Sequence, residues 1–303
     1  MAEEAVSASD IGVDIPGYSS LFAKPRALTT DEIASIIDRF ATTARLAETA
    51  GFTGVQIHAA HGYLISQFLS PLTNNRRDEW GGSLENRAQL LFKAIEAVRN
   101  KVSPEFCVSV KLNSADFQKG GFEQSDAKWV VEQLGEFDVD LVELSGGSYE
   151  SPAMQGLESD NSSGRREAYF IDFAQEIAKV AKCPVMVTGG IRKLDTANDA
   201  IANDAAGYGV SVLGIARALA FEPDLPNNWK TGATPEILVP DVRWKSKALA
   251  SLATMAIAKA QLERMSVGKS PNSKIWPIGA LIADQFRTWK RTKRYRNWRK
   301  ATR

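Results

Sequence analysis

The sequence predicts an α/β protein built around a parallel sheet. Segments with helical spacing of apolar residues alternate with short β-branched runs, which is the rhythm of repeated βα units. Each short run is followed by a turn rich in Gly, Ser, His or Asn. Barrels and doubly wound sheets both place their active sites at the carboxyl ends of the strands, so we expect the chemistry at these turns.

The first helix is predicted by the capping-box spacing of Thr29 and Glu32, followed by apolar residues that recur at helical spacing. It should end near Ala50, because Gly51 comes next. The run Val55–His58 is too short for a helix and has the composition of a strand. These residues form one helix-strand step.

The same step recurs four times. The expected helices are at about Leu84–Asn100, Asp126–Gly135, Ala168–Ala181 and Asp195–Asn203. The strands that should follow them are Cys107–Leu112, Leu141–Leu144, Pro184–Val187 and Tyr208–Gly214. After Pro226 the pattern weakens into a loop, an Ala-rich helix at about Lys245–Met265 and a basic tail.

Composition sets limits on the class of protein. Apolar residues make up 44% of the 303 residues and charged residues 24%, which excludes a disordered or fibrous chain. Two cysteines cannot form a disulfide framework or a cysteine zinc site. No apolar run has the length of a membrane span, and the first residues do not resemble a secretory signal. We therefore expect a cytoplasmic protein.

The net charge of +1 hides an uneven distribution. Residues 286–303 contain nine Lys or Arg and no acidic residue, so the first 285 residues carry a net charge of −8. The usual explanation of such a run is a solvated tail. Binding of a nucleic acid or an anionic membrane remains an alternative, because aromatic residues interleave with the charges, but nothing else in the sequence supports a nucleic-acid partner.

The chain has only two histidines, and both lie in the loop His58-Ala59-Ala60-His61 after a predicted strand. A zinc site would need a third ligand, and none follows at a suitable spacing, so no metal is expected. A structural role, in which ring N–H groups satisfy loop carbonyls, remains open. The other interpretation is that both imidazoles donate to one substrate oxygen, with the phenol of Tyr63 as a proton donor.

The stretch Gly51–Ser83, which contains this loop, closely resembles the old yellow enzyme family of FMN-dependent ene-reductases, and its motif residues are similar to those of fungal members. Further blocks agree in the same order: Lys111–Phe117, Glu143–Gly147, Arg166–Phe170, Thr188–Gly190 and Gly214–Arg217. The resemblance covers about Pro25–Trp229. It divides the chain into an N-terminal segment (1–24), a barrel domain (25–229), a helical extension (230–285) and the basic tail (286–303).

The resemblance implies a (β/α)8 TIM barrel that binds FMN, takes electrons from NADH or NADPH and reduces the C=C bond of an α,β-unsaturated carbonyl compound (an enone). It implies that His58 and His61 hold the substrate carbonyl and that Tyr63 protonates the α carbon. Lys111 would lie beside the flavin pyrimidine. The residues implied at the FMN phosphate are Gly189, Gly190, Ala216 and Arg217. The alternative for Lys111 is a strand-end residue that reaches solvent, and Gly189-Gly190 taken alone is only a turn. Without the resemblance, Arg217 would equally be a phosphate ligand or a surface charge.

The His58 strand is the fourth of eight in the family, yet only about fifty residues precede it here. We therefore expect five βα units, with strands one to three missing. This leaves two functional hypotheses, an FMN-dependent oxidoreductase or a truncated, non-catalytic remnant that binds flavin or another ligand. Oligomeric state stays open. Arg76, Asp78 and Trp80, in the loop after the histidines, are expected to be structural.

Overall fold

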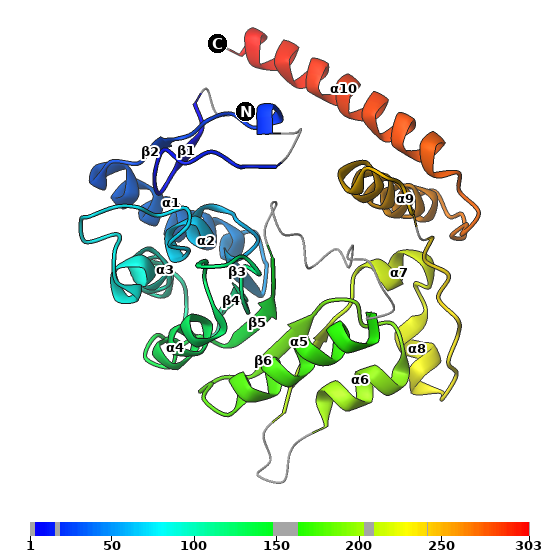
Figure 1. Cartoon of the computed structure of the whole chain (residues 1–303), viewed down its shortest axis with the longest axis horizontal. Coiled ribbons are helices and arrows are strands. Elements are labelled where there is room, and N and C mark those ends of the chain that lie inside the picture. The colour runs from blue at the N-terminus through cyan, green and yellow to red at the C-terminus, as the bar shows by residue number, and fades with distance from the viewer. Residues whose placement is uncertain (1–3, 16–18, 148–162, 203–208, 241, 303) are drawn as a thin grey trace. The chain divides into compact units, whose positions relative to one another are not determined.

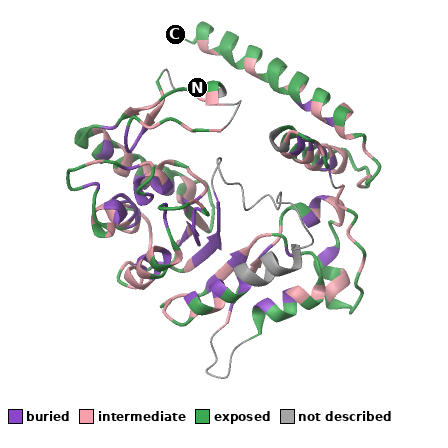
Figure 2. Ribbon diagram, in the orientation of Figure 1, coloured by how far each residue is buried: buried purple, intermediate pink, exposed green. Residues whose placement is uncertain are grey.

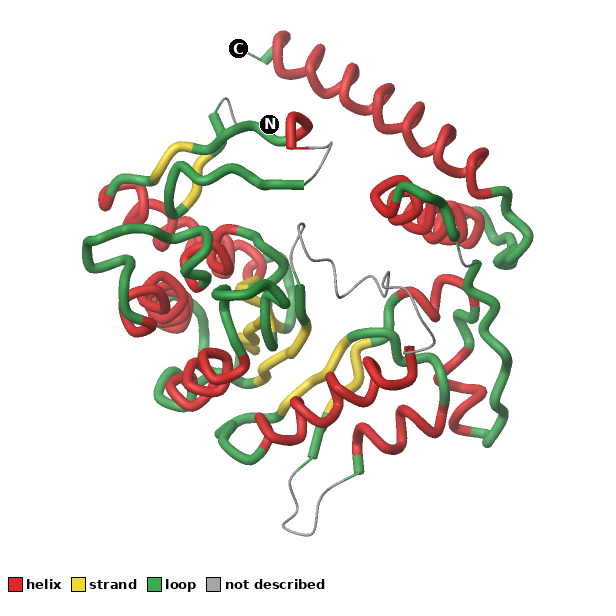
Figure 3. Tube along the Cα trace, viewed as in Figure 1, coloured by secondary structure: helices red, strands yellow, loops and turns green. Residues whose placement is uncertain are grey.

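The computed structural model describes the whole chain except residues 1–3, 16–18, 148–162, 203–208, 241 and 303. The chain forms two units. The first contains Met1–Gly189 and Thr196–Gly214, and the second contains Gly190–Asp195 and Ile215–Arg303. All five strands of the main sheet lie in the first unit, and Figure 3 draws the strands in yellow.

That sheet has five parallel strands in the order β3-β4-β5-β6-β7 (Figure 1). Their bounds are β3 Gly54–Ala59, β4 Cys107–Asn113, β5 Leu141–Ser145, β6 Val185–Thr188 and β7 Val212–Gly214. Each strand pairs with the next one in the chain, which is the neighbour order of consecutive βα units in a barrel. The predicted α/β class and its five βα units are confirmed.

The last strand is shorter than the predicted Tyr208–Gly214. Within the described residues it begins at Val212, and Tyr208 lies outside them. Its partner β6 is only four residues long and begins at Val185. The backbone N–H of Ser211 still donates to the Val185 carbonyl at 2.8 Å, but the ladder ends there. The length of the partner, which local composition does not reveal, limits the strand.

The two faces of the sheet differ in chemistry. One face carries apolar side chains, among them Ile57, Val110 and Val142, which match one another in register and are at most 3% exposed. Figure 2 shows this buried material along the strands and on the helices beside them. Because side chains alternate along a strand, the neighbouring residues His58 and Lys111 point to the opposite face.

The helices of the first unit begin and end close to their predicted positions. They are α1 Thr30–Thr49, α2 Leu64–Leu69, α3 Leu84–Arg99, α4 Gln124–Leu134, α5 Ser163–Ala178 and α6 Leu194–Ile201, the last of which begins in the second unit. The capping box is formed, since Thr29 Oγ1 accepts from the Glu32 N–H and the Glu32 carboxylate accepts from the Thr29 N–H. Helix α5 begins five residues before the predicted start, and the short α2 was not predicted.

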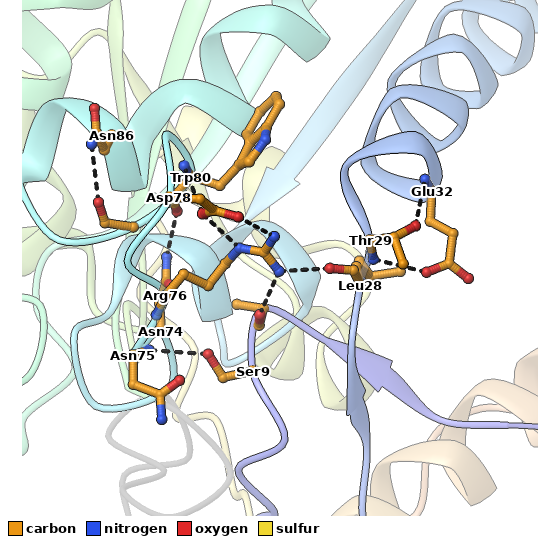
Figure 4. A network of polar contacts seen from close by, with 12 residues as sticks. Ser9, Leu28, Thr29, Glu32, Asn74, Asn75, Arg76, Asp78, Trp80 and Asn86 are labelled. Carbon is orange, nitrogen blue, oxygen red and sulfur yellow. Dashed lines mark hydrogen bonds and ion pairs between the residues drawn. The ribbon is translucent and has the colours of Figure 1, made fainter.

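The N-terminal segment belongs to the first unit and packs on the loop after α2. Strands β1 (Val6–Ser7) and β2 (Arg26–Ala27) form a parallel pair, and a 3-10 turn covers Ser19–Leu21. Arg76 donates to the carbonyls of Ala8 at 3.1 Å and Leu28 at 2.6 Å, and it pairs with Asp78 at 2.5 Å. Figure 4 shows Arg76 between Leu28 and Asp78. These contacts agree with the structural role expected for this loop.

The second unit contains helices α7 Arg217–Phe221, α8 Leu225–Lys230, α9 Lys247–Ser266 and α10 Pro277–Ala301. The core of this unit is formed by three alanines and an isoleucine of α9, one residue of α10 and one of the loop before α9: Val242, Ala250, Ala253, Ala256, Ile257 and Ala280. Helix α9 was predicted, but the basic tail is instead mostly the C-terminal part of α10. No Gly or Pro interrupts residues 281–303, so nothing there breaks the helix. None of the described helices has both the length and the apolarity of a membrane span.

Candidate functional site

The polar face of the sheet carries a row of chemistry-bearing residues at one level. His58 on β3 is paired in register with Lys111 on β4, and Lys111 with Glu143 on β5. In a parallel sheet, residues paired in register point to the same face. The sheet therefore brings together an imidazole, an ammonium group and a carboxylate that lie 85 positions apart along the chain from first to last.

His58 is half-buried and its ring orientation is fixed by the backbone. The N–H of Ala60 donates to His58 Nδ1 at 3.2 Å. A ring nitrogen that accepts a hydrogen bond carries no proton, so the neutral ring is protonated on Nε2 and offers that N–H as a donor. Burial, together with the positive charge of Lys111, lowers the pKa of His58, and both effects favour this neutral form.

His61 is held by two neighbouring strands. Its backbone N–H donates to Asn113 Oδ1 at 3.1 Å, and its Nε2 lies 2.7 Å from Ser145 Oγ. The residue has a φ of 63°, in the left-handed region that few non-glycine residues adopt. Burial, then the charges of Lys111 and His58, lower the pKa of His61 to about 4. The ring is therefore neutral near pH 7.

Tyr63 completes this cluster from the start of α2. Its ring centroid lies 4.9 Å from that of His58 in an edge arrangement, and the His58 and His61 centroids are 5.2 Å apart. Tyr63 is 47% exposed, so its phenol is accessible to a ligand. The three residues that the sequence grouped as catalytic candidates are thus brought into one place.

The loop that carries these residues is tied to the N-terminal segment. Gln67 Nε2 donates to the Gly62 carbonyl at 2.9 Å, and Ser7 Oγ donates to Gln67 Oε1 at 2.8 Å. Gly62 has a φ of 75°, which glycine adopts without strain. Residues ahead of Pro25 therefore help to fix the shape of the histidine loop.

Lys111 does not reach solvent freely. Its Nζ lies 2.7 Å from Glu143 Oε1, and the two side chains are 18% and 7% exposed. The alternative interpretation of Lys111 as a solvated strand-end residue is therefore not supported by its surroundings. The ammonium group of Lys111 therefore compensates the charge of the buried Glu143 carboxylate and still lies at the polar face of the sheet.

The candidate phosphate residues are divided between the two units. Gly189 ends the first unit after β6 with a φ of 139°, and a Cβ built on it would meet nothing within 4 Å, so its backbone is open to a ligand. Gly190, Ala216 and Arg217 belong to the second unit, where Arg217 is the first residue of α7. Desolvation of the guanidinium and the nearby charge of Arg192 lower the pKa of Arg217, although the residue as a whole is exposed.

Sequence reasoning did not assign roles to four residues that the structure brings to these places. Asn113 and Ser145 hold His61, Glu143 pairs with Lys111, and Arg192 lies near Arg217. Asn113 and Ser145 stand at strand ends, where the polar turn residues were already noted. Their partners become visible only with the register of the strands.

The described residues contain no group of three or more His, Cys, Asp or Glu side chains that could hold a metal ion. Cys107 and Cys183 are free thiols, and burial raises the pKa of both. Neither cysteine lies in surroundings that would favour a reactive thiolate.

The donor set on the polar face fits a flavin. A lysine ammonium group at the level of the histidines suits the electron-rich pyrimidine edge of the ring, and Gly189 leaves room beside the end of β6. Neutral ring N–H groups and an accessible phenol suit a carbonyl ligand on the flavin. A parallel α/β sheet with this set at its strand ends is suited to the barrel class of flavin-binding proteins.

Comparison with known proteins agrees with this class. The model of the NADH:flavin oxidoreductase / NADH oxidase family matches residues 2–236. The chain belongs to this family, which includes the old yellow enzymes and uses FMN with NADH or NADPH as reductant. The match begins well ahead of the boundary at Pro25 that the motifs predicted, in keeping with the contacts of the N-terminal segment.

Two curated fungal relatives are similar over most of this chain. The NADH-dependent flavin oxidoreductase nadA of Aspergillus parasiticus is 39% identical over 78% of this chain and 52% of its own length. The NADH-dependent flavin oxidoreductase iliE of Hypocrea jecorina is 44% identical over 68% of this chain and 51% of its own length. The chain thus spans about half the length of the curated relatives it matches.

Among solved structures, the old yellow enzyme homologue of Zymomonas mobilis is similar with a TM-score of 0.59 and 26% identity. The likeness covers 78% of this chain and 63% of that one. The five-stranded parallel sheet is therefore a part of a TIM barrel, as the resemblance implied.

Proposed function

We propose that this protein is an FMN-dependent NAD(P)H oxidoreductase that reduces the C=C bond of an α,β-unsaturated carbonyl compound. The observation that supports this most directly is the cluster of two neutral imidazoles and an accessible phenol beside Lys111. Such a set binds a carbonyl oxygen and supplies a proton, and these are the two tasks that enone reduction leaves to the protein.

FMN would be held by Lys111 at its pyrimidine edge and by Gly189, Gly190, Ala216 and Arg217 at its phosphate. Bound FMN supplies the hydride chemistry, accepting from a reduced nicotinamide and delivering to the β carbon of the substrate. Lys111 would stabilise negative charge, and Glu143 would hold the ammonium group in place. Arg192 adds positive charge near Arg217, which favours a phosphate dianion there.

The substrate carbonyl would be bound by His58 and His61. His58 offers its Nε2–H because Nδ1 already accepts the Ala60 N–H. His61 is positioned by Asn113 and Ser145, so its ring is held in place before the substrate arrives. Two preorganised donors stabilise the negative charge that develops on the carbonyl oxygen, and a neutral donor pays no extra cost for desolvation of a charge.

Tyr63 would donate a proton to the α carbon. Its phenol stands beside His58 and is accessible. A carbanion-like α carbon takes a proton from a neutral phenol, which needs no prior ionisation.

The first experiment is an absorption spectrum of the purified chain with added FMN, followed by titration with a simple phenol. Bound oxidised flavin and a long-wavelength band from a phenolate stacked on it are the expected results. His58→Ala should keep the flavin and weaken phenol binding, because the imidazole contacts the ligand oxygen. A chain that binds flavin but shows no enone reduction would instead be the non-catalytic remnant, and a chain without flavin would contradict the proposal.

A matched variant separates the two roles in the cluster. Tyr63→Phe should bind phenol and flavin normally and accept hydride from NAD(P)H at the normal rate, because that half-reaction needs no proton at an α carbon. Only the half-reaction with an enone should slow. Equal slowing of both half-reactions would exclude Tyr63 as the proton donor.

A further inference from the structure

Helix α10 is attached to α9 along one side. Ala280 and Asp284 are buried there, and Lys259 Nζ of α9 lies 3.0 Å from Asp284 Oδ2. Arg287 continues this side, with its Nη1 2.7 Å from Glu263 Oε2. Asp284 and Arg287 are therefore paired within the second unit, although the buried Nη2 of Arg287 has no hydrogen-bond partner among the described residues.

The opposite side of α10 is an exposed apolar stripe. The stripe consists of four apolar residues that follow one another at intervals of four, four and three positions. At 100° per residue around the helix axis, their side chains lie within about 80° of one another. They are Ile278, Ile282, Phe286 and Trp289, and they are 44%, 62%, 61% and 58% exposed. Phe286 and Trp289 stack with ring centroids 5.9 Å apart.

The same stripe continues as cations. Lys293, Arg296 and Lys300 follow at the next helical positions, and Lys293 Nζ lies 5.5 Å from the centre of the Trp289 ring. Among the described residues, six exposed cations of α10 have no carboxylate partner: Lys290, Arg291, Lys293, Arg294, Arg296 and Lys300. One stripe is thus apolar in its first half and cationic in its second.

We propose that this stripe binds the anionic phospholipid surface of a membrane, with α10 lying in the plane of that surface. A helix in a membrane interface buries apolar and aromatic side chains at the boundary of the acyl chains and pairs its Lys and Arg with anionic headgroups. The long Lys and Arg side chains reach headgroups while the helix axis stays parallel to the surface.

The aliphatic residues favour a lipid surface over a nucleic acid. Aromatic rings can stack on bases and cations can pair with either phosphate, so Trp289 and Lys293 fit both partners. Ile278 and Ile282 have no stacking face, and their exposed area gains free energy only when an apolar phase covers it. Ile278 and Ile282 lie on the same stripe as Phe286 and Trp289, so the apolar boundary of a lipid bilayer would cover all four side chains at once.

The test is flotation of the full chain with phosphatidylcholine vesicles that contain about one third phosphatidylserine, and with vesicles of phosphatidylcholine alone. We expect binding to the first at about 0.1 M salt and weaker binding at about 0.5 M, where headgroup attraction is screened. The triple variant Lys293→Gln, Arg296→Gln, Lys300→Gln should bind on the order of 100-fold more weakly, because each charge contributes roughly fivefold.

A matched control removes three exposed lysines from the first unit instead, Lys93→Gln, Lys101→Gln and Lys128→Gln, which changes the net charge equally. This control should bind vesicles like the unchanged chain. The apolar variant Ile282→Gln, Phe286→Gln should lose binding although its charge is unchanged, and circular dichroism checks that the helix remains.

Three outcomes would overturn the proposal. One is equal weakening by the control, which would mean that total charge and not the stripe determines binding. Another is tighter binding to a single-stranded oligonucleotide than to anionic vesicles. The third is a dimer in light scattering that the apolar variant dissociates, with no vesicle binding by the unchanged chain, since a second copy would then cover the stripe.

Discussion

Because the pKa of His61 is lowered in the folded chain, the folded state should lose stability in mild acid. The pKa of His61 is about 6.5 in the unfolded chain and about 4 in the folded one. Between these two pH values the unfolded state binds a proton and the folded state does not. Stability contributed by the neutral ring is complete above pH 6.5 and is lost as the pH falls toward 4. For one such site the loss between pH 7 and pH 5 is about 2 kcal/mol. Because the ring is partly solvated, we expect roughly half of that, about 1 kcal/mol.

The perturbation is His61→Asn, which removes the titrating ring and suits the left-handed backbone at this position. Urea unfolding at pH 7 and pH 5 gives the loss of stability for each protein. The variant should lose about 1 kcal/mol less than the unchanged chain over this range, whatever its absolute stability. Carboxylates titrate equally in both proteins and cancel in the comparison.

Ring-proton NMR provides an independent measurement, because the chain has only two histidines and the variant assigns both signals. The reasoning would be refuted by a His61 signal that titrates near pH 6.5. It would also be refuted by the same loss of stability between pH 7 and pH 5 in the variant and the unchanged chain.

Three further changes test the packing around the site. Gly54→Ala would place a Cβ 2.6 Å from atoms of the paired residue on β4 and should destabilise by about 1–3 kcal/mol in urea unfolding, whereas Gly12→Ala meets nothing within 4 Å and should be nearly neutral. Lys111→Met leaves Glu143 buried without its cation and should cost about 3 kcal/mol, and a second change Glu143→Leu should recover most of the loss; no recovery would contradict the pairing. Arg76→Met removes donors to two N-terminal carbonyls and should speed amide hydrogen exchange in residues 6–9 and 26–28, while unchanged exchange would show that these bonds are dispensable.

Most helices and strands of the βα units could be predicted because each depends on residues close together in the sequence. The capping box at Thr29 and Glu32, the glycine after α1 and the β-branched runs each determine their own element. The pair β1 and β2 has only two residues in each strand, and it depends on a contact between residues 20 positions apart. Helix α10 was missed because strong positive charge resembles a solvated tail, although the residues themselves favour a helix.

The candidate site could be predicted in part for the same reason. His58, His61 and Tyr63 stand in one short loop, so their proximity follows from the sequence. The partners of Lys111 and His61 come from other strands, and a shift of one residue in register would move Glu143 and Ser145 to the opposite face. Local patterns do not determine that register.

The Lys111–Glu143 pair is itself an argument about function. Removing two charges from water costs free energy that their attraction seldom exceeds, so an apolar pair at this level of the sheet would serve stability as well or better. The opposite face shows that the same strands accept apolar residues at neighbouring positions, as at Val110 and Val142. A cation and a carboxylate beside two neutral histidines therefore indicate a face shaped for a polar ligand, at some expense in stability. If that ligand is FMN, its binding should stabilise the first unit and offset part of the stability that is lost as the pH falls toward 4.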